Sequence, residues 1–257
     1  MEKLKRGDRI KMYLAYLSLN SPISIKKFLN FAVENKIPEI TSRRDVKLLE
    51  SLNYIDLEMG LIKLNDSKEY EATRDEKHSA NREEKAKIAL TAVSMIKEKE
   101  LFVGAGTTCE MFVKSINTPI KLLYTNGFEV ARVANLNVNI NRVVLIGGKL
   151  RPQSSAMCGP IANMVVETLK FSQSFITVTN MDAEFNLCNN NEDEAYLTNK
   201  VISRSGEVVC LMDHTKFNQN FYGNIISNVS SIDQLVIDKE IEGPEFEELK
   251  TKTNVKW

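Results

Sequence analysis

Residues 102–112 of the chain read FVGAGTTCEMF, a short apolar run followed by two glycines, two threonines and the start of an apolar-periodic segment. An apolar run bounded by glycine predicts a buried strand, and the spacing from Thr108 onward predicts a helix. Strand, glycine turn and helix in this order form the beginning of a β-α unit. The same order recurs along the chain, so this stretch indicates the fold class.

β-α units follow one another from residue 88 to the region of residue 250. The predicted strands are LFV, KLLYTN, RVVLIGG, SFITVT, EVVCLMD and QLVID. Helices are predicted at IALTAVSMI, from Thr108, and at FEVARVANL, IANMVVETLKF, EDEAYLTNKVI and GPEFEELK. This alternation of compact apolar strands with helices predicts an α/β fold whose mostly parallel sheet is covered by helices on both faces. Ligands of such sheets bind beyond the carboxyl ends of the strands.

The glycine turn does not match the common nucleotide-binding loops. Cys109 stands where a dinucleotide fingerprint has its third glycine, and the Gly-Lys-Ser/Thr of a Walker loop is absent. Glycines would still let backbone N–H groups approach an anion, and threonine hydroxyls would add donors at a helix N-terminus. We therefore expect a single phosphate here, with a turn that binds nothing as the alternative. The candidate residues are Gly104, Gly106, Thr107 and Thr108.

Polar residues also follow other predicted strands. They are Thr125 and Asn126, then Gly147, Gly148 and Arg151, and finally Asp213 and Lys216. The carboxyl ends of parallel strands meet at one edge, so these side chains should converge on one mouth that suits sugar hydroxyls and a phosphate. The run NNNEDEAY adds Glu192, Asp193 and Glu194 at a helix start, where the helix dipole stabilises acids with or without a ligand.

Three short helices are predicted in the first 50 residues. Ile10, Tyr13, Leu14 and Leu17 repeat at helical spacing, and NSP at residues 20–22 ends that helix. Ser24 is suited to cap a second helix, and Pro38 marks the first turn of a third. The segment YIDLEMGLIKLND then partly alternates around Met59 and Gly60, which predicts a small hairpin or wing.

The third predicted helix begins with hydroxyl and basic residues. Residues 1–50 carry a net charge of +5 and the remainder −5, so a polyanion is the expected partner of the N-terminal part only. Three helices with paired arginines early in the third describe a helix-turn-helix that reads the major groove, whereas a solvated helix face is the alternative. The candidate DNA contacts are Thr41, Ser42, Arg43, Arg44 and Lys47.

Residues 65–87 are polar and charged, so we expect a linker that becomes helical towards its end. The predicted organisation is therefore a DNA-binding domain at residues 1–64, this linker, and a ligand-sensing domain at residues 88–257.

Several classes of protein are disfavoured by composition. No apolar run reaches the ~18 residues of a membrane span, so a cytoplasmic protein is expected. Four scattered cysteines contain no CxxC pair, which predicts buried free thiols rather than a metal site or disulfides. His78 and His214 form no metal cluster and no recognisable nucleophile and base pair, so we expect neither a catalytic residue nor a cofactor.

Taken together, these motifs resemble those of the DeoR family of bacterial transcription repressors over nearly the full length. The T-x-R-R-D motif of the family matches Thr41 to Asp45, and its other motifs match GTT at residues 106–108, TN at residues 125–126, IGGKLR followed by CGPIA, and DHTK at residues 213–216. The GxGTT loop, TNMD, DEAY and the terminal VKW are most similar to the branch that regulates lactose utilisation.

The resemblance implies a winged helix-turn-helix followed by a sensor fold shared with phosphosugar isomerases such as ribose-5-phosphate isomerase and with CoA transferases. It also implies operator DNA as one partner, tagatose 6-phosphate or a related sugar phosphate as inducer, and a homodimer or homotetramer. Two alternatives stay open. One is a sugar-phosphate isomerase or deaminase with an added N-terminal domain. The other is a paralogue that does not bind DNA, suggested by Asp56 and Glu58 in the wing.

Overall fold

The computed structural model describes residues 4, 6–52, 54–65, 74–217 and 223–257. The chain divides into two compact units, residues 1–72 (unit 1) and residues 73–257 (unit 2). Among the described residues, no helix has the length and apolar character needed to cross a membrane.

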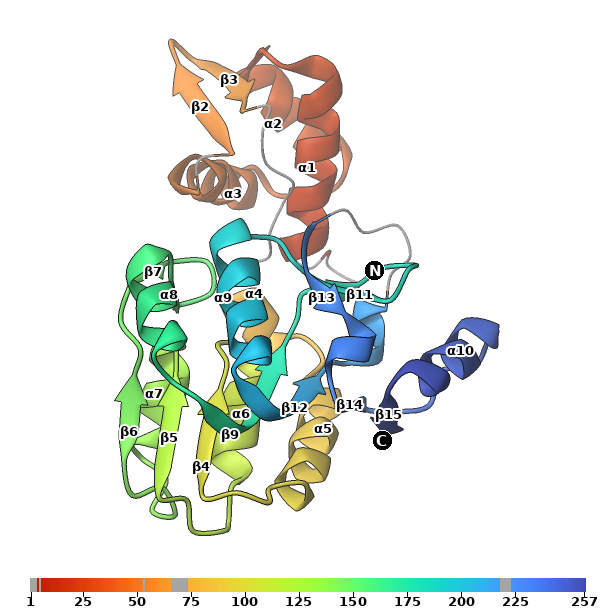
Figure 1. Cartoon of the computed structure of the whole chain (residues 1–257). Helices are drawn as coiled ribbons and strands as arrows, with labels where there is room; N and C mark the ends of the chain where they lie inside the picture. Colours follow the sequence, from red (N-terminus) through yellow and green to blue (C-terminus); the bar gives the residue numbers. More distant parts are fainter. Residues whose placement is uncertain (1–3, 5, 53, 66–73, 218–222) are drawn as a thin grey trace. The chain divides into compact units, whose positions relative to one another are not determined.

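Unit 1 contains three helices and a three-stranded antiparallel sheet within its described part (Figure 1). The elements are α1 (Arg6–Asn20), β1 (Ile23–Ser24), α2 (Ile25–Glu34), α3 (Glu39–Ser51), β2 (Ile55–Glu58) and β3 (Leu61–Leu64), and the strand order is β1-β3-β2. Three helices followed by a hairpin is the order that the sequence predicts. Apolar residues of α1, α2, α3 and the strands pack into one core, which includes Ile10, Tyr13, Leu17, Phe28, Leu49 and Ile62.

The helix cap and the hairpin turn that the sequence predicts in unit 1 are both present in the structure. Ser24 is the N-cap of α2, and its side chain accepts a hydrogen bond from the Lys27 backbone N–H at 3.3 Å. Met59 and Gly60 both have positive φ, 47° and 78°, in the tight turn between β2 and β3. Two such residues match the twist of a hairpin, which explains the glycine at this turn.

Unit 2 is built on a seven-stranded sheet, counted over its described residues, in which every neighbouring pair of strands is parallel. The strand order is β15-β14-β12-β9-β4-β5-β6. The bounds are β4 (Glu100–Val103), β5 (Leu122–Thr125), β6 (Val143–Leu145), β9 (Phe171–Thr177), β12 (Ser205–Leu211), β14 (Gln234–Val236) and β15 (Asn254–Lys256). The predicted parallel sheet is therefore confirmed.

Helices cover both faces of this sheet (Figure 1). On one face pack α5 (Arg82–Ser94), α6 (Thr107–Ser115) and α7 (Phe128–Ala134), and on the other α8 (Pro160–Glu167), α9 (Glu192–Ser203) and α10 (Pro244–Lys252). Successive strand residues point to opposite faces, so Leu101 and Val103 enter the first core and Phe102 enters the second. The strands are buried on both sides, which explains their continuous apolar sequence.

The order of the strands reverses between β4 and β9. From β4 the chain proceeds outward through β5 and β6, and it then returns to β9 and proceeds the other way through β12, β14 and β15. The loops that leave β4 and β9 therefore diverge at the carboxyl edge of the sheet. Such a switch point is where open α/β sheets bind ligands.

The structure adds elements that the sequence pattern did not predict. They are the hairpin of β7 (Lys149–Arg151) and β8 (Ala156–Cys158), and a small sheet of β10 (Asn180–Met181), β11 (Asn186–Asn189) and β13 (Asn224–Asn228). Short 3-10 turns occur at His214–Lys216 and Val229–Ser231. Most of these segments are short and polar, so neither apolar alternation nor a long apolar run identifies them.

The segment expected to be a linker is largely part of unit 2. Residues 66–73 lie outside the described residues, but α4 (Arg74–Ser79) and α5 (Arg82–Ser94) already belong to the compact unit. Arg74 forms an ion pair at 2.7 Å with Glu110, whose side chain is 4% exposed, and Lys85 is buried. Unit 2 therefore begins before residue 88, because buried charges of α4 and α5 hold these helices in place together with the apolar face of α5.

Candidate functional site

The loop after β4 passes very close to the end of β9. Gly104 donates its N–H to the Phe175 carbonyl at 2.8 Å, and Gly106 has a φ of 138° at the N-terminus of α6. A Cβ atom on Gly106 would lie 2.4 Å from the Thr177 Cγ2 atom. Glycine is therefore required at Gly106 by both backbone conformation and space.

Asn126 fixes the loop after β5 against its neighbours. Its Oδ1 accepts the Ala105 N–H at 3.1 Å, and its Nδ2 donates to the Met157 carbonyl at 3.1 Å. Thr125 is fully buried, and its hydroxyl accepts the Gly127 N–H at 3.0 Å. The Thr-Asn pair thus joins the loops that follow β4 and β5 to strand β8.

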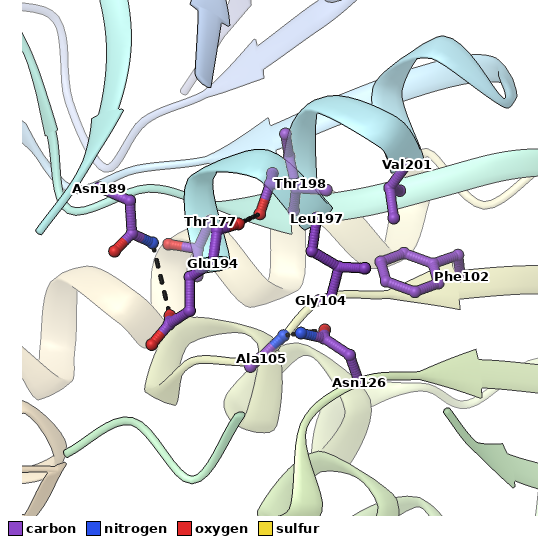
Figure 2. A pocket seen from close by; sticks show the side chains of 11 residues that line it. Phe102, Gly104, Ala105, Asn126, Thr177, Asn189, Glu194, Leu197, Thr198 and Val201 are labelled. Carbon is purple, nitrogen blue, oxygen red and sulfur yellow. Dashed lines mark hydrogen bonds between the residues drawn. The ribbon is translucent and has the colours of Figure 1, made fainter. Parts of the chain in front are cut away.

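A pocket opens at the switch point between β4 and β9 (Figure 2). It encloses about 350 Å³ of space including its open mouth. Polar groups from several loops and from α9 face it, above an apolar floor. The lining residues are Phe102, Gly104, Ala105, Asn126, Ile176, Thr177, Asn189, Glu194, Leu197, Thr198 and Val201.

Glu194 is the charged group of this pocket. It lies in the first turn of α9, where the N-cap Asn191 accepts the Glu194 N–H at 3.1 Å. Its Oε1 accepts from Arg151 Nη1 at 2.8 Å and from Ser154 Oγ at 2.6 Å. Its Oε2 accepts from Asn189 Nδ2 at 3.5 Å (Figure 2). The carboxylate thereby connects the β7–β8 hairpin to α9 and presents oxygen acceptors to the pocket.

Two lysine ammonium groups lie beside the glycine loop, that of the buried Lys85 and that of the half-buried Lys216. Lys216 Nζ donates to the Val178 carbonyl at 2.6 Å and to the Thr177 hydroxyl at 3.3 Å. Lys85 Nζ donates to the Ala80 carbonyl at 2.7 Å and to the Lys77 carbonyl. Burial lowers the pKa of both groups, and burial together with the nearby charge of Lys216 lowers the pKa of Lys85 to about 8. An anion between them would be strongly attracted.

Asp213 organises the loop that carries Lys216. It is buried, and its Oδ1 accepts from the Thr215 N–H at 3.2 Å, from the Thr215 hydroxyl, and from Asn81 Nδ2 at 3.0 Å. Its negative charge favours the protonated form of Lys216. We assign Asp213 to positioning this loop.

The structure brings together only part of the predicted ligand set. Gly104, Asn126 and Glu194 line the pocket, and Arg151 reaches Glu194. Thr107 bonds to the Lys77 carbonyl at 3.4 Å, on the same side as the two lysines. Gly147 is exposed on the loop after β6.

Two predicted side-chain contacts are corrected by the structure. Thr108 and Thr125 are 1% and 0% exposed, so these side chains pack inside the unit instead of facing a ligand. Gly148 is needed for packing, since a Cβ there would lie 2.7 Å from the Cys158 carbonyl oxygen. Polar residue type identified the loop but could not show which side chains turn inward.

Lys85 was missed because it lies in the segment interpreted as a linker. A signal was present, since Lys85, Ile88, Ala89 and Ala92 have i, i+3, i+4, i+7 spacing and all four are buried. Asn189, Ser154 and Thr177 were also missed, because they lie in short elements without a periodic pattern.

In unit 1, α3 presents basic side chains to solvent. Arg43, Arg44 and Lys47 are exposed, and Arg43 pairs with Glu39 at 2.7 Å on the surface. Thr41 is half-buried. Ser42 is a further correction, because it is fully buried and shares a 2.8 Å hydrogen bond with the Tyr13 hydroxyl.

A buried ion pair fixes α3 to α1. Asp45 Oδ2 lies 2.8 Å from Arg9 Nε, and the two side chains are 4% and 14% exposed. Asp45, the acid of the TSRRD motif, is therefore buried in an ion pair within unit 1, whereas Arg43 and Arg44 of the same motif are exposed to solvent.

Metal and thiol chemistry find little support in the part of the chain that the structure describes. No group of three or more His, Cys, Asp or Glu residues there could hold a metal ion. The four cysteines are buried free thiols, and burial raises the pKa of each.

A family model and several known proteins are similar to this chain. A family model described as "DeoR C terminal sensor domain" matches residues 80–239. The lactose phosphotransferase system repressor of Staphylococcus aureus is 31% identical over 222 residues, which cover 85% of this chain and 87% of that protein. The repressor of the same name from Lactococcus lactis is 27% identical and covers 98% of both chains. The HTH-type transcriptional regulator GlpR of Haloferax volcanii is 30% identical and covers 82% of both.

Some solved structures are similar to this chain in part, at low identity. A D-ribose-5-phosphate isomerase in complex with phospho-erythronic acid is 14% identical with a TM-score of 0.39, covering 53% of this chain and 54% of the other. The eIF2B delta subunit of Chaetomium thermophilum is 11% identical with a TM-score of 0.44, covering 89% and 73%.

Proposed function

The chain belongs to the DeoR family of transcriptional regulators, and on this premise we propose that it is a DNA-binding repressor of a sugar-utilisation operon that a phosphorylated sugar releases from its operator. Unit 1 would bind the operator, and unit 2 would bind the sugar phosphate. The names of the relatives refer to the lactose phosphotransferase system, and the resemblance of the ligand loops to that branch supports tagatose 6-phosphate as the effector.

The DNA-binding half of the proposal is supported by α3. The three exposed basic side chains Arg43, Arg44 and Lys47 lie on one side of a helix that packs against α1 and α2, as the second helix of a helix-turn-helix does. The Arg43–Glu39 pair is exposed, so it would cost little to exchange for a phosphate or a base. A homodimer or homotetramer would present two such helices to a symmetric operator.

Alanine variants of the two arginines test this half. Arg44→Ala or Arg43→Ala should weaken operator binding by roughly 1 to 3 kcal/mol if the arginine reads a base, and should lower the salt dependence if it contacts phosphate. Arg142→Ala is the matched control, because it removes an exposed arginine from unit 2. Fluorescence anisotropy at several salt concentrations measures both quantities. Unchanged binding by both arginine variants would contradict the placement of α3 on DNA.

One observation carries the sensing half. The ammonium group of the half-buried Lys216 lies beside a glycine loop at a helix N-terminus, next to a polar pocket at the sheet switch point. Its hydrogen bonds go to two uncharged oxygens, so a phosphate would add a directly bonded anion to the nearby charge of Asp213. Asn126, Asn189 and Glu194 then offer amide and carboxylate groups for sugar hydroxyls.

A thermal-shift comparison tests the sensing half. Tagatose 6-phosphate, galactose 6-phosphate and fructose 6-phosphate are compared with unphosphorylated tagatose. A ligand that binds only the folded protein stabilises it by about 2.7 kcal/mol at a hundred times its Kd. We expect at least one phosphorylated sugar, and not tagatose, to raise the melting temperature. No response to any phosphorylated sugar would contradict the proposed sensor.

An enzyme of the phosphosugar isomerase type is the second candidate function, and few features of the structure support it. The resemblance to phosphosugar isomerases implies catalytic acids after the strand equivalent to β9, where this chain has Asp182. Asp182 instead accepts the N–H groups of Glu184 at 3.0 Å and Asn186 at 2.8 Å, which holds the turn before β11. His214 pairs with Asp238 at 2.8 Å. NMR detection of turnover of any of the three sugar phosphates would favour the enzyme.

A further inference from the structure

Helix α3 has a buried and an exposed stripe of side chains, and both follow helical spacing. The buried stripe has i, i+3, i+4, i+7 spacing and consists of Ser42, Asp45, Val46 and Leu49. Residues 40, 43, 44 and 47 repeat this spacing on the other side of the helix, and all four are exposed. Three of them are the basic residues that are proposed to contact DNA. The fourth is Ile40, which begins the stripe.

Neither packing nor helix stability explains an isoleucine at residue 40. Its side chain is 65% exposed and is not part of the apolar core of unit 1. Isoleucine is also a poorer helix former than alanine, because its branched side chain loses rotamer freedom in a helix. A single exposed apolar side chain is common on protein surfaces, so its meaning depends on its neighbours. Here the neighbours one turn further along the helix are Arg43 and Arg44.

The position of Ile40 is the one that reads bases in a helix-turn-helix. Ile40 is the second residue of α3, and the N-terminal residues of a recognition helix contact base edges in the major groove. The acid that precedes it, Glu39, pairs with Arg43 at 2.7 Å. All residues of α3 are described, and no other large apolar side chain of this helix is exposed. The exposed stripe therefore has one apolar group, at its N-terminal end.

The major groove presents one apolar group at the base edges, the C5-methyl group of thymine. An isoleucine side chain against this methyl group would remove apolar surface of both from water. A cytosine at the same place would present an amino donor, which isoleucine cannot accept. Contact with isoleucine therefore favours thymine over cytosine.

We propose that Ile40 reads a thymine of the operator through contact with its C5-methyl group. This inference rests on the proposed DNA-binding function and adds a specificity-determining residue to it. Arg43 and Arg44, one turn further along the same stripe, would contact neighbouring bases or phosphates.

The test replaces thymine by deoxyuracil, which lacks the methyl group and forms the same hydrogen bonds. The full-length wild type first selects a duplex from random sequence, and the thymines of this duplex are then replaced one at a time. Fluorescence anisotropy at one fixed salt concentration measures each affinity. We expect the replacement of one particular thymine to weaken binding about fourfold, which corresponds to one methyl group that is no longer buried.

Two variants assign this effect to a side chain. Ile40→Ala should bind the thymine duplex and the deoxyuracil duplex equally well, and its salt dependence should equal that of the wild type because no charge is removed. Leu19→Ala is the matched control, since it removes an apolar side chain of α1 that is 86% exposed. We expect Leu19→Ala to keep the fourfold preference for thymine.

Two results would overturn this inference alone. One is a wild type that binds its selected duplex and loses no affinity with any deoxyuracil replacement. The other is an Ile40→Ala variant that keeps the wild-type preference for thymine. A wild type that selects no duplex from random sequence would overturn the proposed DNA-binding function together with this inference.

Discussion

Gly106 is the residue on which the glycine loop most depends. Gly106→Ala would place a methyl group 2.4 Å from Thr177 Cγ2 at a φ of 138°, so it should lower the free energy of unfolding by roughly 1 to 3 kcal/mol. Gly104→Ala is the matched control, because a Cβ there meets its nearest atoms at 3.6 Å, an ordinary contact. Urea denaturation of both variants measures the difference, and equal stabilities would contradict the described loop.

Lys85 should make stability depend on pH. Its folded pKa of about 8 lies below the ordinary value of 10.5, so between these values the unfolded chain binds more protons. The free energy of unfolding should therefore rise with pH through this window, by up to about 3 kcal/mol for this residue. The measurement is the stability of wild type minus that of Lys85→Met at pH 7.5 and pH 9.5. If this difference in stability is the same at both pH values, the lowered pKa of Lys85 is contradicted.

Sequence alone could identify polar loops but not the direction of each side chain. Gly104, Asn126, Glu194 and Arg151 were predicted from residue type and position, and they lie at or beside the pocket. Ser42, Thr108 and Thr125 carry the same kinds of groups yet are buried, because packing against distant residues decides which way a side chain turns. Such contacts are not encoded in local spacing.

At the scale of the element, α3 depends on a contact that the TSRRD motif does not reveal. Arg9→Leu would leave Asp45 buried without its ion-pair partner, which should destabilise unit 1 by roughly 3 kcal/mol. Arg43→Leu is the control, since its pair with Glu39 is exposed and should contribute within about 0.5 kcal/mol. Hydrogen exchange of α1 and α3 amides measures unit 1, with unit 2 as internal reference. Equal amide exchange of α1 and α3 in both variants would contradict a stabilising role for the Arg9–Asp45 ion pair.

Long elements were predictable and short ones were not. The strands and helices of the β-α units have apolar runs and helical periodicity that local physics can interpret. β10, β11 and β13 are held by long-range pairing, such as Leu187 with Ser227, and their sequence is polar. α4 is equally short, and its position depends on Arg74, Lys85 and Glu110, which are far apart in the sequence.

At the scale of the whole molecule, the sequence predicted a parallel sheet but not its strand order. β9 pairs with β4 although some 70 residues separate them, and this pairing creates the switch point and hence the pocket. Alternation of strands and helices is compatible with several orders, so the place where polar loops meet could be stated only as an edge of the sheet.

The opposite net charges of the N-terminal 50 residues and the rest of the chain also act at this scale. If the proposed function is right, the basic first 50 residues attract DNA, and the acidic remainder does not compete for it. Operator binding should therefore weaken steeply with salt, whereas Lys85 and Lys216 in unit 2 should keep most of their affinity for a sugar phosphate. Anisotropy for DNA and calorimetry for the sugar phosphate, each at 50 and 200 mM salt, compare the two, and equal salt dependence would contradict this division of roles.

The central claim is that occupancy of the sugar-phosphate site in unit 2 controls DNA binding by unit 1. Fluorescence anisotropy tests it most directly, with full-length protein, a DNA duplex that the protein itself selects from random sequence, and one fixed salt concentration. Tagatose 6-phosphate, or another phosphorylated sugar that raises the melting temperature, should weaken the affinity for this duplex by about 5- to 150-fold, while unphosphorylated tagatose should leave it unchanged. An affinity that stays the same when a bound sugar phosphate is saturating would contradict the claim.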